Sequence, residues 1–115
     1  RAPPATYAKI HVDAGVRTRR GGAAVAGAGI ARLFLGSSAL VILGIWDPAT
    51  LEAMACREGI ALGEDLNIQR FVLSSDCKQV IGDIAKGNQG PYEAIIMKII
   101  SRSSPLSCTF TIESR

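Results

Sequence analysis

The sequence has 115 residues, of which 48% are apolar and 20% are charged, so it suffices for one domain and is too apolar for a wholly disordered chain. The formal net charge is +3, and residues 1–20 carry a local charge of +4 because five basic residues stand against Asp13 alone. A basic segment on a nearly neutral body is typical of a protein with an anionic partner such as nucleic acid, and it also fits a solvated basic loop.

Cysteine usage and hydropathy exclude two further classes of protein. The three cysteines lie far apart: Cys56, Cys77 and Cys108. A structural zinc site needs about four nitrogen or sulfur ligands at close spacing, so we expect no zinc and reduced, mostly buried thiols. Residues 21–46 hold a single charge, Arg32, but their glycines favour a soluble hairpin over a membrane span. No signal peptide is visible, so we expect no membrane partner and a nuclear or cytoplasmic location.

The first 43 residues predict three strands. Residues 7–14 alternate between apolar and polar side chains, which indicates a strand with one buried face and with Asp13 at its carboxyl end. The basic residues 17–22 end in two glycines and predict a loop. Two apolar runs then predict a hairpin that turns at Arg32 or at the glycines just before it: residues 23–31 and 33–43.

The rest of the chain predicts three helices and two strands. Asp47 before Pro48 predicts a helix start, because the aspartate can accept hydrogen bonds from free N–H groups and proline lacks the N–H that would be unpaired there. That helix runs to about Gly63 and carries Glu52 in its first turn. The later predicted elements are a strand over 71–75 that ends at Asp76, a helix from Cys77 to Gly87, a helix around 95–100, and a strand over 106–112.

This order predicts a single α/β domain. Three antiparallel strands come first, parallel strands joined by helical crossovers follow, and the helices pack on a mixed sheet of about five strands. Trp46, just before the helix cap, is interpreted as a hydrophobic staple against Leu51, with base stacking as the alternative.

Three acids lie where α/β proteins place functional groups. Asp13 and Asp76 end strands, and Glu52 lies between them on a helix. Carboxylates that converge repel one another unless a cation or a proton lies between them, and hard oxygen ligands suit Mg²⁺ or Mn²⁺. A pair of such ions promotes in-line phosphoryl displacement. Each acid alone also fits a cap, a turn or a solvated side chain, so the ordered triple is what favours a metal site.

Residues 8–114 resemble the ribonuclease H family, and more narrowly the plant reverse-transcriptase-like ribonuclease H domains of retroelement-derived proteins. Two segments are the most specific: residues 52–58, Glu-Ala-x-Ala-x-Arg-Glu, and residues 75–78, Ser-Asp-Cys-Lys. The resemblance also includes Lys9–Ala14, Gly21–Ala23, Leu35–Ser38, Leu51–Gly59 and Val72–Val80.

The resemblance implies a ribonuclease H-like mixed sheet and metal-dependent hydrolysis of the RNA strand of an RNA–DNA hybrid. Two Mg²⁺ or Mn²⁺ ions are implied, and we expect no small-molecule cofactor and a monomer. The implied catalytic and metal-binding residues are Asp13, Glu52 and Asp76. Basic residues would contact phosphates, and the expected nucleic-acid-binding residues are Arg17, Arg19, Arg20 and Lys78.

Two departures from the family pattern keep an alternative open. Fully active members carry a fourth acid, commonly with a histidine, on a helix after the last strand, and the sequence stops at Arg115 before such a helix. We therefore expect residues 1–115 to form one domain that lacks this helix. The family's polar turn between the second and third strands is replaced by residues 27–32. The alternative is a catalytically weak or inactive nucleic-acid-binding or interaction domain of the same fold, a retroelement relic or fragment.

Overall fold

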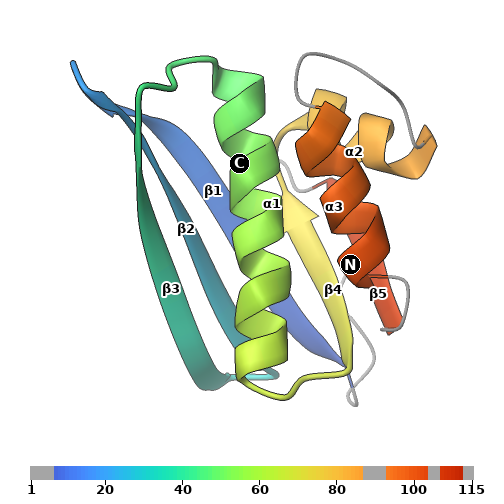
Figure 1. Cartoon of the computed structure of the whole chain (residues 1–115). Helices are drawn as coiled ribbons and strands as arrows, with labels where there is room; N and C mark the ends of the chain where they lie inside the picture. The colour runs from blue at the N-terminus through green and yellow to red at the C-terminus, as the bar shows by residue number, and fades with distance from the viewer. Residues whose placement is uncertain (1–6, 87–92, 104–106, 113–115) are drawn as a thin grey trace.

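A five-stranded mixed sheet and three helices form the part of the chain that the computed structural model describes, which is residues 7–86, 93–103 and 107–112 (Figure 1). The elements in chain order are β1 (Ala8–Thr18), β2 (Gly21–Ile30), β3 (Leu33–Leu43), α1 (Pro48–Asp65), β4 (Arg70–Ser75), α2 (Lys78–Lys86), α3 (Glu93–Ser103) and β5 (Ser107–Ile112). The strands lie in the order β3-β2-β1-β4-β5. The pairs β1–β2 and β2–β3 are antiparallel, whereas β1–β4 and β4–β5 are parallel. The predicted α/β architecture is confirmed.

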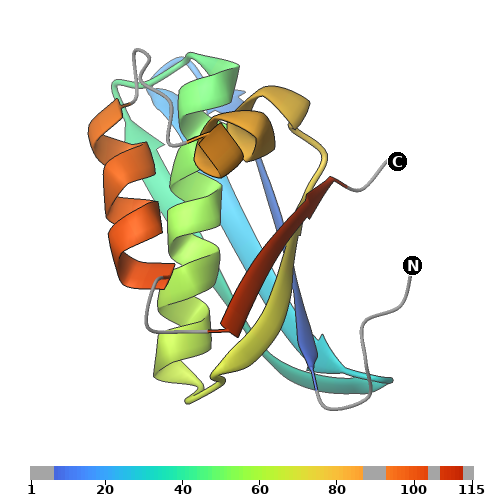
Figure 2. The ribbon, with the colours of Figure 1, turned by 90° about the vertical axis from the view of Figure 1, so that its right-hand side faces the viewer.

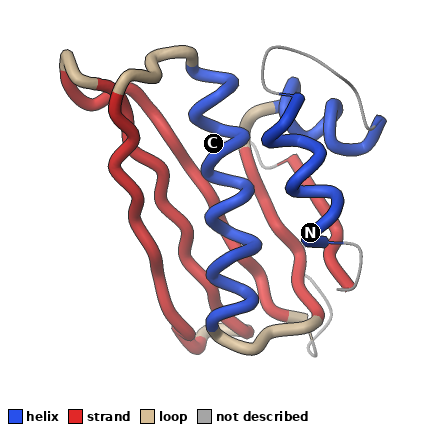
Figure 3. Tube along the Cα trace, in the orientation of Figure 1, coloured by secondary structure: helices blue, strands red, loops and turns tan. Residues whose placement is uncertain are grey.

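The helices lie on one face of the sheet, as the side view and the tube trace show (Figures 2 and 3). The alternation predicted for the first strand explains this layering, because Ala8, Ile10 and Val12 point into the core while Lys9 and His11 point to the other face. The core residues of α1 include Leu51, Ala55 and Ile60. None of the described helices is long and apolar enough to span a membrane.

The start of α1 follows the predicted cap. The Asp47 side chain accepts hydrogen bonds from the Thr50 N–H (3.0 Å) and from the Thr50 hydroxyl (2.6 Å), and Pro48 is the first helical residue. These contacts satisfy donors that a helix start leaves open. The helix runs two residues beyond the predicted end at Gly63. The predicted helix stop at Gly87 lies outside the described residues.

Two glycines allow α1 to lie close to the sheet. A Cβ atom at Gly59 would lie 2.6 Å from Val12 Cγ1 and 2.9 Å from Leu73 Cδ1, and one at Gly63 would lie 3.0 Å from Phe71 Cε1. Contacts this short cannot form without a shift of the helix or of buried side chains. The glycines therefore set how near α1, and every side chain that it carries, comes to β1 and β4.

The predicted loop over residues 17–22 is wrong. Strand β1 continues to Thr18 and β2 begins at Gly21, so only Arg19 and Arg20 form the turn. The basic side chains of this segment favour a loop when the sequence is considered alone. In the structure, pairing between β1 and β2 keeps the backbone extended as far as Thr18 and again from Gly21. Gly21 has a φ of +149° and no room for a side chain, since a Cβ atom there would lie 2.1 Å from the Ile42 carbonyl oxygen. The predicted turn near Arg32 is confirmed.

The face of the sheet away from the helices is apolar over β2 and β3. Small residues cover β2 on this face, and at Gly27 a Cβ atom would meet no atom within 4 Å. On the edge strand β3, Phe34 is 70% exposed and Val41 is 74% exposed. Strand β3 contains no charged residue. No described element covers this face (Figure 2).

The three cysteines are free, as expected from the sequence. Cys56 is fully buried in α1, and Cys77 and Cys108 are partly buried. Burial raises the pKa of all three thiols, which keeps them protonated and unreactive at neutral pH.

Candidate active site

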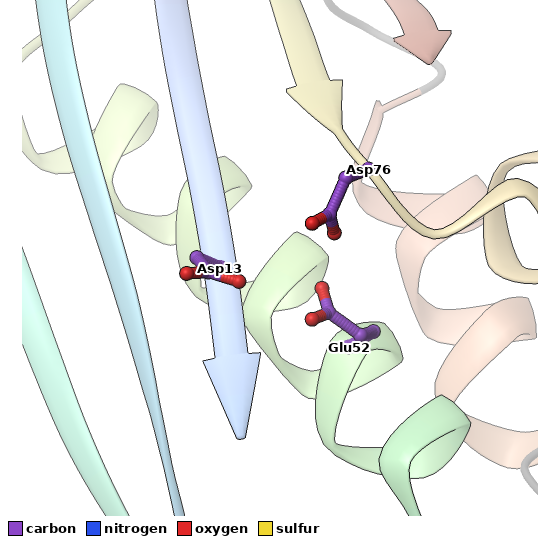
Figure 4. Close-up of side chains that lie close together, drawn as sticks. All are labelled: Asp13, Glu52 and Asp76. Carbon is purple, nitrogen blue, oxygen red and sulfur yellow. The ribbon is translucent and has the colours of Figure 1, made fainter. Parts of the chain in front are cut away.

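Three carboxylates converge from three separate elements: Asp13 from β1, Glu52 from α1, and Asp76 from the turn after β4 (Figure 4). One oxygen from each side chain can be chosen so that all three lie within 4.8 Å of one another. The structure therefore brings together the three acids that the sequence singles out.

The register between β1 and β4 places the two aspartates. The parallel pairing of these strands ends at the pair of His11 and Ser74. Asp13 and Asp76 each follow that pair by two residues. Asp13 lies in the middle of β1, so the prediction that it ends its strand is wrong. What ends near Asp13 is the pairing with β4, because β1 continues in pairing with β2 alone.

Glu52 is buried at the centre of the cluster, with 8% of its surface exposed. The prediction that Glu52 lies in the first turn of the helix is wrong. Because α1 starts at Pro48, Glu52 lies in its second turn. Burial, followed by the charges of Asp76 and Asp13, raises the pKa of the Glu52 carboxyl to about 7. Two hydrogen bonds, from the Ala14 N–H and the Ser75 hydroxyl, act in the opposite direction with smaller effect.

A main-chain amide joins two of the acids. The Ala14 N–H donates to Asp13 Oδ1 (2.9 Å) and to Glu52 Oε1 (3.2 Å). This amide lies beyond the last residue of β1 that pairs with β4. One donor thus orients a side chain of the sheet and a side chain of the helix.

Ser75, which is not among the residues predicted from the sequence, supports the cluster from β4. Its side chain is buried, its hydroxyl donates to Glu52 Oε2 (3.4 Å), and its oxygen accepts from the Cys77 N–H (3.1 Å). The signal in the sequence was a hydroxyl residue between an apolar strand and Asp76. Its neighbour Ser74 makes a different contact, a 2.9 Å hydrogen bond with Thr111 on β5.

Comparison with known proteins gives matches among solved structures. Neither a protein-family model nor a curated protein matches the sequence. The N-terminal RNase H domain of a Mycobacterium tuberculosis protein, solved as a fusion with maltose-binding protein, aligns with a TM-score of 0.83 and 17% identity over 95% of this chain and 83% of that chain. LC11-RNase H1, isolated from compost and solved in complex with an RNA/DNA hybrid, aligns with a TM-score of 0.77 and 15% identity over 94% of this chain and 86% of that chain.

A viral structure extends this set. The foamy viral protease-reverse transcriptase in complex with an RNA/DNA hybrid aligns with a TM-score of 0.78 and 8% identity, over 98% of this chain and 18% of that chain. The chain has the ribonuclease H fold. The narrower assignment to plant retroelement-derived domains stays a prediction.

Within this ribonuclease H fold, the carboxylate cluster fits a hard divalent cation. Two oxygens on opposite sides of a Mg²⁺ ion lie about 4.2 Å apart, given metal–oxygen bonds of about 2.1 Å. The three carboxylate oxygens of the cluster lie within 4.8 Å of one another, so a small inward movement of the side chains suffices to coordinate one ion. The pKa of Glu52 shows that its ionisation in the metal-free protein is costly and that its two acidic neighbours add to the cost. A cation would offset this repulsion, so the residues present suit Mg²⁺ or Mn²⁺.

The basic residues predicted to bind nucleic acid lie at two places in the ribonuclease H fold. Arg19 and Arg20 are exposed at the β1–β2 turn, six and seven residues beyond Asp13, which is about 20 Å along an extended strand. The expectation from the sequence that these arginines lie beside the acids is therefore not met for Arg19 and Arg20. Arg17 belongs to β1, but its side chain lies outside the described part of the structure. Lys78 is exposed at the start of α2, two residues after Asp76.

Proposed function

We propose that the protein is a metal-dependent endoribonuclease that hydrolyses the RNA strand of RNA–DNA hybrids. The observation that carries this proposal is the convergence of Asp13, Glu52 and Asp76 within 4.8 Å in a ribonuclease H fold. Two structural neighbours were solved in complex with an RNA/DNA hybrid, which supports this class of substrate. The three acids are proposed as the ligands of two ions, Mg²⁺ or Mn²⁺.

Divalent ions bound there would supply a water of lowered pKa and would neutralise charge that develops on the phosphate. The chain's own contribution is to hold the ligands in place. The Ala14 N–H orients Asp13 and Glu52 together, and Ser75 holds the second oxygen of Glu52. Burial keeps bulk water away from Glu52, so that its charge acts with little screening.

Phosphate contacts by basic residues would bind the hybrid without regard to sequence, and the 2′-hydroxyl groups would distinguish its RNA strand from its DNA strand. Lys78 is exposed two residues after Asp76, and Arg19 and Arg20 are exposed in the turn after β1, so these residues are proposed to contact phosphates of the hybrid. Such binding is expected to weaken steeply as the salt concentration rises.

Cleavage of a hybrid labelled on each strand tests the proposal. We expect the wild-type protein to cut only the RNA strand, and only with Mg²⁺ or Mn²⁺ present. Asp76→Asn should abolish cleavage, whereas Asp65→Asn should not, because Asp65 is an exposed acid at the far end of α1. A folded wild-type protein that binds the hybrid without cutting it would instead be the inactive binding domain. A protein that neither binds nor cuts the hybrid contradicts the proposal altogether.

A further inference from the structure

The β1–β2 turn is fastened to the segment that connects β3 with α1. The Gly44 N–H donates to the Arg20 carbonyl oxygen (2.6 Å), and the Trp46 indole N–H donates to the Arg19 carbonyl oxygen (3.1 Å). Both carbonyl groups of the two-residue turn are thus held by one neighbouring segment. The turn and Trp46 consequently form a single ordered tip, which lies at the same end of the molecule as the start of α1 (Figure 1).

Trp46 remains 49% exposed, although the indole N–H, the only polar group of its side chain, already has a hydrogen-bond partner. It does not belong to the buried core, and the hydrophobic staple against Leu51 stays a prediction. The hydrogen bond to Arg19 fixes the indole ring while leaving much of its apolar surface in water. A fixed, half-exposed aromatic ring is suited to packing against a flat or weakly polar group of a ligand, because little conformational freedom is lost on contact.

The charged groups at this tip favour an anionic ligand. Arg19 and Arg20 are both exposed. Asp47, next to Trp46 in the chain, keeps its negative charge while its carboxylate accepts from the Thr50 N–H and hydroxyl, so the two arginines outnumber this acid. Two guanidinium groups beside an aromatic face match a nucleic acid strand, since guanidinium groups bind phosphates and aromatic rings pack on bases and sugars.

We infer that Trp46, Arg19 and Arg20 form a binding site for a nucleic acid strand, in which the indole packs on a sugar or base and the two arginines bind adjacent phosphates. The inference deepens the proposed function and rests on it for the identity of the ligand. The tip lies about 20 Å along β1 from Asp13. A strand of a hybrid placed over the carboxylates would therefore meet the tip several nucleotides away from the bond to be cut.

Trp46 is the one tryptophan in the sequence, so its fluorescence reports on this tip directly. In EDTA, which prevents metal-dependent cleavage, hybrid is titrated into a fixed concentration of protein while tryptophan emission is recorded, and protein is titrated into labelled hybrid in parallel while hybrid anisotropy is recorded. We expect the emission to change and to saturate at the same protein-to-hybrid ratio as the anisotropy. If the anisotropy saturates while the emission stays constant, the hybrid binds elsewhere, and the inference fails while the proposed function stands. If the anisotropy does not change, the tip does not bind the hybrid and the inference fails, whereas the proposed function is decided by the cleavage assay with Mg²⁺ or Mn²⁺.

Substitutions separate the ring from the charges. Trp46→Ala should weaken hybrid binding roughly 5- to 100-fold, as loss of one stacking contact does.

Arg19→Ala retains the carbonyl group that holds Trp46, so it should leave the emission of the free protein unchanged. It should also lower the slope of log affinity against log salt concentration by about 1. Arg70→Ala removes an equal charge from an exposed position at the start of β4 and is the matched control. Equal slopes for Arg19→Ala and Arg70→Ala would overturn the role of Arg19.

Discussion

Asp13 in β1 and Asp76 just after β4 occupy matching positions, because each follows the last β1–β4 residue pair by two residues. Their side chains reach the same point only while that register holds. A shift of one residue between the two strands would turn one of the aspartates to the opposite face. The geometry of the candidate site thus depends on a short parallel pairing of four residue pairs, together with the helix that brings Glu52 to the same place.

Glu52→Gln is expected to stabilise the metal-free protein at alkaline pH. The pKa of Glu52 rises from its ordinary value of 4.5 to about 7 on folding. The folded protein therefore holds this proton more tightly than the unfolded chain, and the stability contributed by the neutral carboxyl is complete below pH 4.5 and lost as the pH rises through about 7. At pH 8 the variant should exceed the wild type by up to about 3 kcal/mol, and near pH 4.5 the two should be close. Urea denaturation at both pH values measures the difference.

Asp65→Asn, which changes an exposed acid of the same helix, serves as the control for that experiment. Its difference from the wild type should vary little between the two pH values. A stability gain for Glu52→Gln that is equal at pH 4.5 and pH 8 would show that ionisation of Glu52 carries no folding cost.

Gly59→Ala and Gly82→Ala are expected to act in opposite directions. At Gly59 the added methyl group would meet Val12 and Leu73 in the core, so the substitution should cost about 1–3 kcal/mol. At Gly82 in α2 nothing lies within 4 Å, and alanine should stabilise the helix by up to about 1 kcal/mol. Chemical denaturation compares the two variants. Effects of the same sign would contradict the close approach of α1 to the sheet.

Ser75→Ala should weaken divalent cation binding as well as stability. The substitution leaves the Cys77 N–H without its acceptor and removes one donor from Glu52, at a cost of about 1–3 kcal/mol. Ser74→Ala is the matched control, because Ser74 is also buried but bonds to Thr111. Titration calorimetry with Mn²⁺ should show several-fold weaker binding for Ser75→Ala than for Ser74→Ala. Equal affinities would limit Ser75 to a structural role.

Mg²⁺ or Mn²⁺ should raise the melting temperature of the wild-type protein, and EDTA should reverse the rise. A ligand that binds only the folded state adds about 2.7 kcal/mol at 100 times its dissociation constant. The rise should be strongly reduced in Asp13→Asn, because the cluster then loses one of its charged ligands. An equal rise in both proteins would place the cation elsewhere. Differential scanning fluorimetry provides the measurement.

The order of elements and the sheet type could be predicted because their signals are local. Alternation marks β1, and the Asp47-Pro48 pair marks the start of α1. Residues 17–22 misled the prediction, since their composition favours a loop and only pairing with β2 makes them a strand. Local sequence carries no information about such pairing.

The acids of the candidate site could also be predicted, but not the way in which they are held. Resemblance and order along the chain singled out Asp13, Glu52 and Asp76. The burial of Glu52 and its contact with the Ala14 N–H depend on how α1 packs on β1, which brings together residues 38 positions apart. A main-chain donor leaves no trace in a sequence, because every residue except proline supplies one.

The bare apolar face over β2 and β3 has a consequence for the colloidal behaviour of the protein. Molecules in solution are kept apart by a net charge of only +3, and this charge falls to zero near the isoelectric point of about 9.0. Added salt shortens the range of the same repulsion. Buffers near pH 7 with little salt should therefore keep the protein monodisperse. Alkaline or concentrated salt solutions should allow Phe34 and Val41 of different molecules to come into contact, so that the protein associates and the solution becomes turbid.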